Sequence, residues 1–263
     1  MSDNSERDGA GSQGIVTAAV LVIGDEILSG RTKDKNIGTI ADHLTSIGIR
    51  LREVRVVADE EPDIIAALDA LRGRYDYVFT TGGIGPTHDD ITADAVAKAF
   101  GVSIDVDPRA RALLVEGQKE DYLNAARLRM ARIPDGAELV LNRVSRAPGF
   151  FIGNVIVMAG VPRVMEAMLA EVTPRLRTGA RLISLSIRTT SPEGLVAPVL
   201  SGTQSDYPDV PMGSYPYYDE GRPGTYLVLR SVDAARLEEA GQTLEARLDA
   251  AGIAHERRVQ ETA

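Results

Sequence analysis

The stretch from Tyr77 to Thr92 constrains the fold of this chain more than any other. It begins with five mainly β-favouring residues, Tyr77 to Thr81, which predict a buried strand. Glycines and a proline then interrupt regular structure, and an amphipathic helix is predicted from near Thr92. A strand, a glycine-rich loop and a helix start form a geometry in which backbone N–H groups can bind an anion. Two carboxylates in the loop, Asp89 and Asp90, add groups able to hold a metal or move a proton.

Strands and helices alternate before this stretch. The pattern predicts strands over Thr17–Ile23 and Arg50–Val57, a helix over Asn36–Ile47, and a second helix that begins at Pro62. Such alternation is typical of βαβ units. We therefore expect an α/β fold with a mostly parallel sheet, and ligands at the carboxyl ends of its strands.

The second half of the chain predicts a change of architecture after residue 178. Before it we expect helices over 107–121 and 123–131, strands over 138–141, 149–152 and 155–158, and a helix from Pro162. Residues 16–177 would form the α/β domain. Residues 180–263 would form a small α+β domain with the order β-α-β-β-α. Residues 1–15 are polar and without periodicity, which predicts a disordered tail.

Composition excludes several classes of protein. The formal net charge is −9 and no basic stripe is visible, which argues against nucleic acid as a partner. No cysteine is present, so disulfides and thiolate zinc sites are excluded. No apolar run reaches membrane-spanning length and no signal core precedes the first strand, so we expect a soluble, cytoplasmic protein.

Three acidic residues, Asp25, Asp59 and Asp90, each follow a predicted strand. Because the carboxyl ends of parallel strands meet at one edge of a sheet, we expect all three at the same rim, as candidate metal ligands. Each also has a purely structural interpretation. Asp25 could form a turn, Asp59 lies in a solvated acidic turn, and Asp90 could cap the following helix.

Two glycine loops supply the candidate ligand-binding groups. They comprise Thr81, Gly82, Gly83, Gly85, Pro86, Thr87 and Thr92 after one strand, and Gly160, Pro162 and Arg163 after another. The spacing fits neither GxxxxGK[ST] nor GxGxxG, so it predicts phosphate binding by backbone amides without naming the ligand. The alternative is that both loops only turn the chain, and that Arg163 only solvates the surface.

Three blocks carry a resemblance to a known family. They read IGDEILSGRTKDKN (Ile23–Asn36), TTGGIGPTHDDIT (Thr80–Thr92) and MAGVPRVM (Met158–Met165). They resemble the molybdopterin-binding domain of the MoaB/Mog type. The resemblance is greatest to the amino-terminal domain of the competence/damage-inducible protein A (CinA) family and to the related domain of FAD synthases. It covers about residues 16–175.

The resemblance implies a three-layer α/β/α sandwich, a homo-oligomer, and a small-molecule ligand. That ligand would be molybdopterin or another phosphorylated pterin, or a dinucleotide such as ADP-ribose or FAD. It also implies that Asp59 and Asp90 are catalytic in a hydrolysis of pyrophosphate that depends on a divalent metal (Mg, Mn or Co). A non-catalytic pterin or nucleotide carrier is the alternative. Nicotinamide-nucleotide deamidation is not expected, because the chain ends before a third domain of the CinA type could begin.

Overall fold

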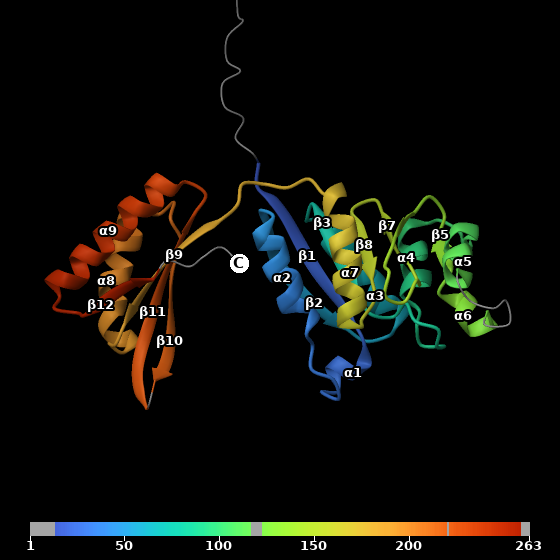
Figure 1. The fold of residues 1–263 in the computed structure, drawn as a ribbon, viewed down its shortest axis with the longest axis horizontal. Coiled ribbons are helices and arrows are strands. Elements are labelled where there is room, and N and C mark those ends of the chain that lie inside the picture. Colours follow the sequence, from blue (N-terminus) through green and yellow to red (C-terminus); the bar gives the residue numbers. More distant parts are fainter. Residues whose placement is uncertain (1–13, 117–122, 220, 259–263) are drawn as a thin grey trace, which may run out of the picture. The chain divides into compact units, whose positions relative to one another are not determined.

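The computed structural model describes residues 14–116, 123–219 and 221–258, which form two units that divide between Gly179 and Ala180. Most of the expected tail, residues 1–13, lies outside the described residues. Figure 1 shows the elements of each unit. No helix among the described residues is long and apolar enough to cross a membrane.

The first unit is built on a six-stranded sheet in the order β2-β1-β3-β8-β7-β6. Its strands are β1 (Val16–Ile23), β2 (Ile49–Val57), β3 (Tyr77–Thr81), β6 (Glu138–Val140), β7 (Gly149–Ile152) and β8 (Val155–Met158). The strands β2, β1, β3 and β8 are parallel, whereas β7 and β6 run antiparallel at one edge. The predicted α/β fold with a mostly parallel sheet is confirmed.

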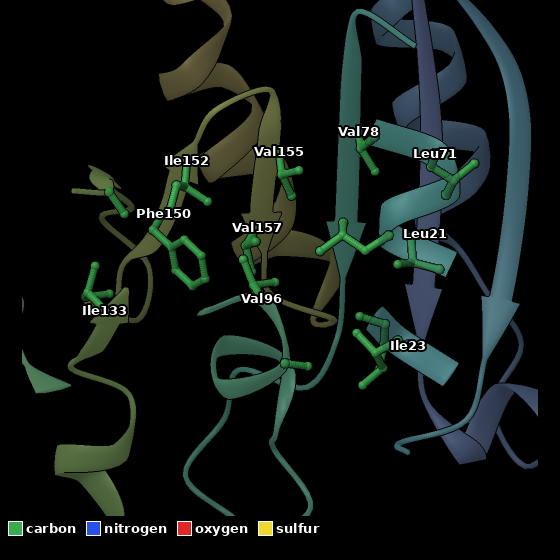
Figure 2. Packing of buried hydrophobic residues seen from close by; sticks show 14 of the residues in the cluster. Leu21, Ile23, Leu71, Val78, Val96, Ile133, Phe150, Ile152, Val155 and Val157 are labelled. Atoms are coloured by element: carbon green, nitrogen blue, oxygen red, sulfur yellow. The ribbon is translucent and has the colours of Figure 1, made fainter. Parts of the chain in front are cut away.

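Helices cover both faces of this sheet. One face packs against α2 (Asn36–Ser46) and α7 (Pro162–Val172), and the other against α3 (Glu61–Arg72) and α4 (Thr92–Phe100). Side chains of β1 alternate between the two cores, as a strand buried on both faces requires. Leu21 and Ile23 face α3 and α4, while Val20 and Val22 face α2 and α7. Figure 2 shows the core between the sheet and the helices α3 and α4.

Smaller elements complete the first unit. They are α1 (Asp25–Leu28), β4 (Ile104–Val106), α5 (Pro108–Val115), α6 (Ala125–Arg129), β5 (Arg132–Pro134) and the 3₁₀ turn η2 (Thr173–Arg175). The antiparallel pair β4–β5 was not predicted. The helix expected over 107–121 ends at Val115, and residues 117–122 lie outside the described residues. Its start agrees with the sequence, because the Asp107 carboxylate accepts hydrogen bonds from the N–H groups of Arg109 and Ala110.

The second unit is an antiparallel sheet with two helices on one face. Its elements are β9 (Ile183–Thr189), α8 (Glu193–Asp206), β10 (Met212–Asp219), β11 (Arg222–Ser231), α9 (Ala234–Ala250) and β12 (His255–Arg258). The strand order is β10-β11-β9-β12, and apolar residues of β9 and β11 pack beneath α8 and α9. The expected α+β fold is confirmed. The last strand, β12, extends the predicted order by one element.

Candidate functional site

The carboxyl ends of β1, β3 and β8 meet at Gly82. This glycine has φ +104°, and a Cβ there would lie 2.0 Å from the backbone oxygen of Ile23, the last residue of β1. The Gly82 N–H donates to the Met158 oxygen of β8 at 3.2 Å. A Cβ on Gly160 would approach the Gly82 Cα to 3.3 Å. Two chain segments therefore approach Gly82 so closely that a larger residue has no room.

Asp90 organises the glycine loop that follows β3. Its carboxylate accepts hydrogen bonds from the N–H of Gly85 at 2.6 Å, the N–H of Thr87 at 2.8 Å and the Thr87 hydroxyl at 2.5 Å. The loop therefore closes on the side chain of Asp90, as in a turn capped by an aspartate. Any contact between Asp90 and a ligand would use the carboxylate lone pairs that these bonds leave over.

Thr92 anchors the same loop by hydrogen bonds to its backbone. It is fully buried, and its hydroxyl donates to the Gly82 oxygen at 3.0 Å while its N–H donates to the Gly83 oxygen at 3.0 Å. A Cβ on Gly83, which has φ +65°, would lie 2.1 Å from the Thr92 Oγ1. Thr92 therefore fixes the conformation of the glycine loop, and any effect on a ligand would be indirect.

Asp25 and Asp59 come together at the ends of β1 and β2. The Asp25 N–H donates to the Asp59 carboxylate at 2.9 Å. Burial raises the pKa of Asp59, and the hydrogen bond from the Asp25 N–H offsets part of that rise. The negative charges of Glu26, Asp25 and Asp89 each raise the pKa by a smaller amount. The side chain of Asp59 thus lies in an acidic environment that favours a bound cation or a retained proton.

The metal site expected at Asp25, Asp59 and Asp90 stays a prediction. Among the described residues, no group of three or more acidic or histidine side chains is arranged to hold a metal. The carboxylate of Asp59, with the negative charge of Asp25 near it, nevertheless suits a hard cation of the Mg²⁺ type. Such a cation takes one or two protein carboxylates and completes its shell with water and substrate phosphates.

A pocket of about 240 Å³ opens where β1 and β3 end, and we call it the strand-end pocket. Residues outside the set of candidate ligand-binding residues also line it, namely Glu26 and residues 32–36. The pocket lies between β1 and β3. The connection after β1 passes over one face of the sheet through α2, and the connection after β3 passes over the other face through α4. Open α/β sheets bind ligands at such a point. Its remaining lining comes from Val22, Ile23, Ile27, Thr81, Gly82, Gly160 and Pro162.

Positive charge and helix starts distinguish the strand-end pocket. The exposed side chains of Lys33 and Lys35 line it, beside the starts of α2 and α7. Neither helix start has a hydrogen bond from the side chain of its N-cap residue. The carboxylates of Glu26 and Asp34 also line the pocket, and Asp34 accepts the Ile37 N–H of α2 at 2.8 Å. This mixture suits a phosphate accompanied by a cation.

The predicted ligand-binding residues fall into two neighbouring hollows. Thr81, Gly82, Gly160 and Pro162 line the strand-end pocket. Gly83, Gly85 and Asp90 line a second hollow of about 20 Å³, room for little more than a water molecule. Pro86, Thr87 and Arg163 are exposed.

Arg129 of α6 lines that second hollow, and no sequence pattern predicted its place there. Its guanidinium donates to the backbone oxygen of Asp90 at 3.2 Å, and Arg132 nearby forms a two-point ion pair with Asp94 at 2.6 and 2.7 Å. These arginines come from a part of the chain with no glycine or acidic pattern. Their contacts arise only because the fold brings α6 and β5 next to the glycine loop and α4.

Comparison with known proteins assigns each unit to a family model. Residues 19–178 match the model described as a probable molybdopterin binding domain, and residues 181–257 match the model described as FAD synthase, middle domain. The first match spans more than half of the chain. It runs from within β1 to beyond η2, and so includes every residue placed above at the strand ends.

Individual relatives agree with these matches. A protein of Pyrococcus abyssi is 37% identical over 199 residues, covering 70% of this chain and 79% of its own length. A CinA-like protein of Citrifermentans bemidjiense is 34% identical over 252 residues, covering 91% of this chain, which spans 60% of that protein. The crystal structure of a CinA protein of unknown function from Thermoplasma acidophilum superposes with a TM-score of 0.57 at 36% identity. It covers 61% of this chain and 98% of its own. The chain therefore belongs to the molybdopterin-binding domain family, as a CinA-like member.

Proposed function

We propose that this protein binds a phosphorylated pterin or a dinucleotide in the strand-end pocket. The observation that carries the proposal is the combination, in one pocket, of Lys33 and Lys35 with the starts of α2 and α7. Lysine ammonium groups and the positive end of a helix dipole both attract phosphate oxygens. The family description supports a pterin, and the match of the second unit to a domain of FAD synthase supports a dinucleotide.

We further propose that the ligand is hydrolysed at a pyrophosphate bond, as in ADP-ribose or FAD. The oxygen of a water molecule forms a bond to one phosphorus, the bridging P–O bond breaks, and two phosphomonoesters leave. A bound divalent cation (Mg²⁺, Mn²⁺ or Co²⁺) would neutralise charge that develops on the phosphoryl oxygens. Asp25 and Asp59 are the residues that suit such an ion.

Asp59 is the group best suited to accept the proton that the attacking water loses. Burial and the neighbouring carboxylates raise the pKa of Asp59, which makes it a stronger base than an ordinary aspartate. The Asp25 N–H, 2.9 Å away, fixes the orientation of the carboxylate. Glu26, whose charge acts on Asp59, also lines the strand-end pocket, so the proposed base lies close to the proposed ligand.

Turnover of ADP-ribose and of FAD with each of the three cations tests the proposal. Asp59→Asn keeps an oxygen that can accept the Asp25 N–H, but it removes the negative charge and the base. We expect turnover to fall about 10²- to 10⁴-fold, which is the usual contribution of a general base, while ligand affinity measured without a divalent cation changes little. Asp63→Asn is the matched control, because Asp63 is an exposed acid in the first turn of α3.

The competing candidate is a carrier that binds the ligand without cleaving it. Ligand binding by the folded wild-type protein, with no cleavage under any of the three cations, would refute hydrolysis and favour the carrier. Absence of binding for both ADP-ribose and FAD would remove the dinucleotide form of the proposal. Molybdopterin that co-purifies with the protein, identified by mass spectrometry, would then favour the pterin.

A further inference from the structure

Two residues that line the strand-end pocket each carry a buried polar atom for which the described residues supply no partner. Asn36, the first residue of α2, is 4% exposed, and Thr81, the last residue of β3, is 1% exposed. Among the residues that the structure describes, neither the Asn36 Oδ1 nor the Thr81 Oγ1 has a hydrogen-bond partner, and both residues line the pocket. Because a buried polar group is destabilising when it is left unsatisfied, both atoms are places where a ligand would supply the missing bond.

The orientation of the Asn36 amide follows from its other contact. Its Nδ2 donates to the backbone oxygen of Gly160 at 2.8 Å. A flipped amide would place its oxygen against the Gly160 oxygen, two acceptors facing each other, so the amide nitrogen must face Gly160. The Asn36 Oδ1 is then left without a donor. It can accept a hydrogen bond but cannot donate one.

Thr81 faces the same side of the sheet as Asn36. Residues alternate along β3, so Thr81 shares its face with Phe79, which packs in the core formed with α2 and α7. Thr80 shares the opposite face with Val78, in the core formed with α3 and α4. The Thr80 hydroxyl is also buried without a partner, but Thr80 is not among the residues that line the pocket.

The hydrogen-bonding chemistry of the two atoms determines which groups of a ligand can bind to them. The ionised phosphates of a sugar phosphate or dinucleotide have no hydrogen to give to the Asn36 Oδ1, so they belong with Lys33, Lys35 and the helix starts. A hydroxyl group can donate to Asn36 and can also exchange a hydrogen bond with Thr81. The pocket, at about 240 Å³, is smaller than the 300–1,000 Å³ or so that is usual for drug-sized ligands. It suits a sugar phosphate better than a whole dinucleotide.

We propose that Asn36 and Thr81 recognise the ribose hydroxyls of the ligand and so determine its specificity. The inference rests on the proposed function, since it assigns one part of the same ligand to one part of the same pocket. The phosphates contact the lysines and helix starts at the mouth. A ribose lies against Asn36 and Thr81, and the rest of a dinucleotide extends out of the pocket.

Competition against ADP-ribose binding tests this assignment. The competitors are ribose 5-phosphate, 2-deoxyribose 5-phosphate and inorganic phosphate, measured by equilibrium dialysis with the full chain. We expect the wild-type protein to prefer ribose 5-phosphate over the deoxy sugar by about tenfold, which corresponds to one hydrogen bond of about 1.4 kcal/mol. Inorganic phosphate should compete least.

Two variants test whether Asn36 and Thr81 cause the preference for ribose 5-phosphate over the deoxy sugar. Thr81→Val removes the hydroxyl and keeps the branched shape, and Asn36→Ala removes the acceptor. Either one should bring the ratio of the two sugar affinities towards one. Thr80→Val is the matched control, since it removes an equally buried hydroxyl from the opposite face of the same strand and should leave the ratio near tenfold. Both valine variants should fold, because they remove a buried group that has no partner.

The ratio separates recognition from a structural role. Asn36→Ala also removes the bond to Gly160, but a loosened pocket would weaken both sugars alike and leave their ratio intact. Binding of ADP-ribose with equal affinities for the two sugars in the wild-type protein would overturn the inference and leave the proposed function standing. So would a wild-type preference that survives both variants, as expected if a water molecule satisfies the two atoms. Failure of ADP-ribose to bind would instead refute the dinucleotide proposal and this assignment with it.

Discussion

Replacement of Gly82 by alanine offers a direct test of how the strand ends are packed. The added Cβ would lie 2.0 Å from the Ile23 oxygen and 3.1 Å from the Ile23 carbonyl carbon, both backbone atoms. Ile23 pairs with Val57 of β2, and the next residue, Gly24, donates its N–H to the Val57 oxygen at 3.1 Å. The clash therefore cannot be relieved by the rotation of a side chain.

Two contributions determine the size of the effect. At φ +104° an alanine adopts a backbone conformation that disfavours L-residues, which costs about 1–2 kcal/mol. Displacing the ends of packed strands adds the usual cost of overpacking, about 1–3 kcal/mol. Gly82→Ala should therefore lower the free energy of unfolding of the first unit by about 2–5 kcal/mol. That is a large fraction of the 5–15 kcal/mol or so by which a domain is stable.

Gly101→Ala supplies the matched control. Gly101 follows α4 with φ +67°, and a Cβ there would meet no atom within 4 Å. It should lose only the conformational part, about 1–2 kcal/mol. The two variants can be compared in urea by hydrogen exchange of peptides from β1 and β3, which reports on the first unit alone. If Gly101→Ala lost as much stability as Gly82→Ala, the argument from close approach would be refuted.

Two further predictions concern Thr92 and Asp59. Thr92→Val keeps the shape of the side chain and removes the donor to the Gly82 oxygen, so we expect a loss of about 1–3 kcal/mol in stability and weaker ligand binding. Thr92→Ser is the control, because it keeps the donor. Equal ligand affinity in the two variants would contradict this role of the hydroxyl. Because burial raises the pKa of Asp59, the folded protein holds that proton more tightly than the unfolded chain does, and stability is lost as pH rises from the unfolded pKa to the folded one. Asp59→Asn should therefore raise the Tm at pH 7, with the gain disappearing below about pH 4, and a gain that persists at lower pH would show that another cause acts.

The first unit could largely be predicted from sequence, because its signals are local. The span of β3 and the start of α4 at Thr92 agree with the sequence patterns, since buried strands and amphipathic helices carry apolar residues at regular spacing. The strand β12 has no such pattern, because its residues His255–Arg258 are polar or charged. Arg257 is held instead by ion pairs to Glu238 and Glu245 of α9. That stabilisation depends on contacts that only the fold creates.

The candidate site was predictable in its location and less so in its composition. Glycines next to strand ends identified the edge of the sheet where the pockets open. The division between two hollows follows from the path of the loop, which turns away after Gly82 and carries Gly83 and Gly85 towards Arg129. Lys33 and Lys35 escaped prediction because their place in the pocket depends on how α2 docks against β1.

The contacts of Asp90 decide which acidic variant can test catalysis. Its carboxylate accepts three hydrogen bonds from the loop that it closes. An asparagine there would turn an N–H group towards one of those donors, so the loop would change together with any chemistry. Loss of turnover in Asp90→Asn would therefore follow from either a catalytic or a structural role. Asp59 receives a single N–H from Asp25, a bond that asparagine preserves, and this makes Asp59→Asn the variant in which a fall in turnover at unchanged affinity reports on the reaction itself.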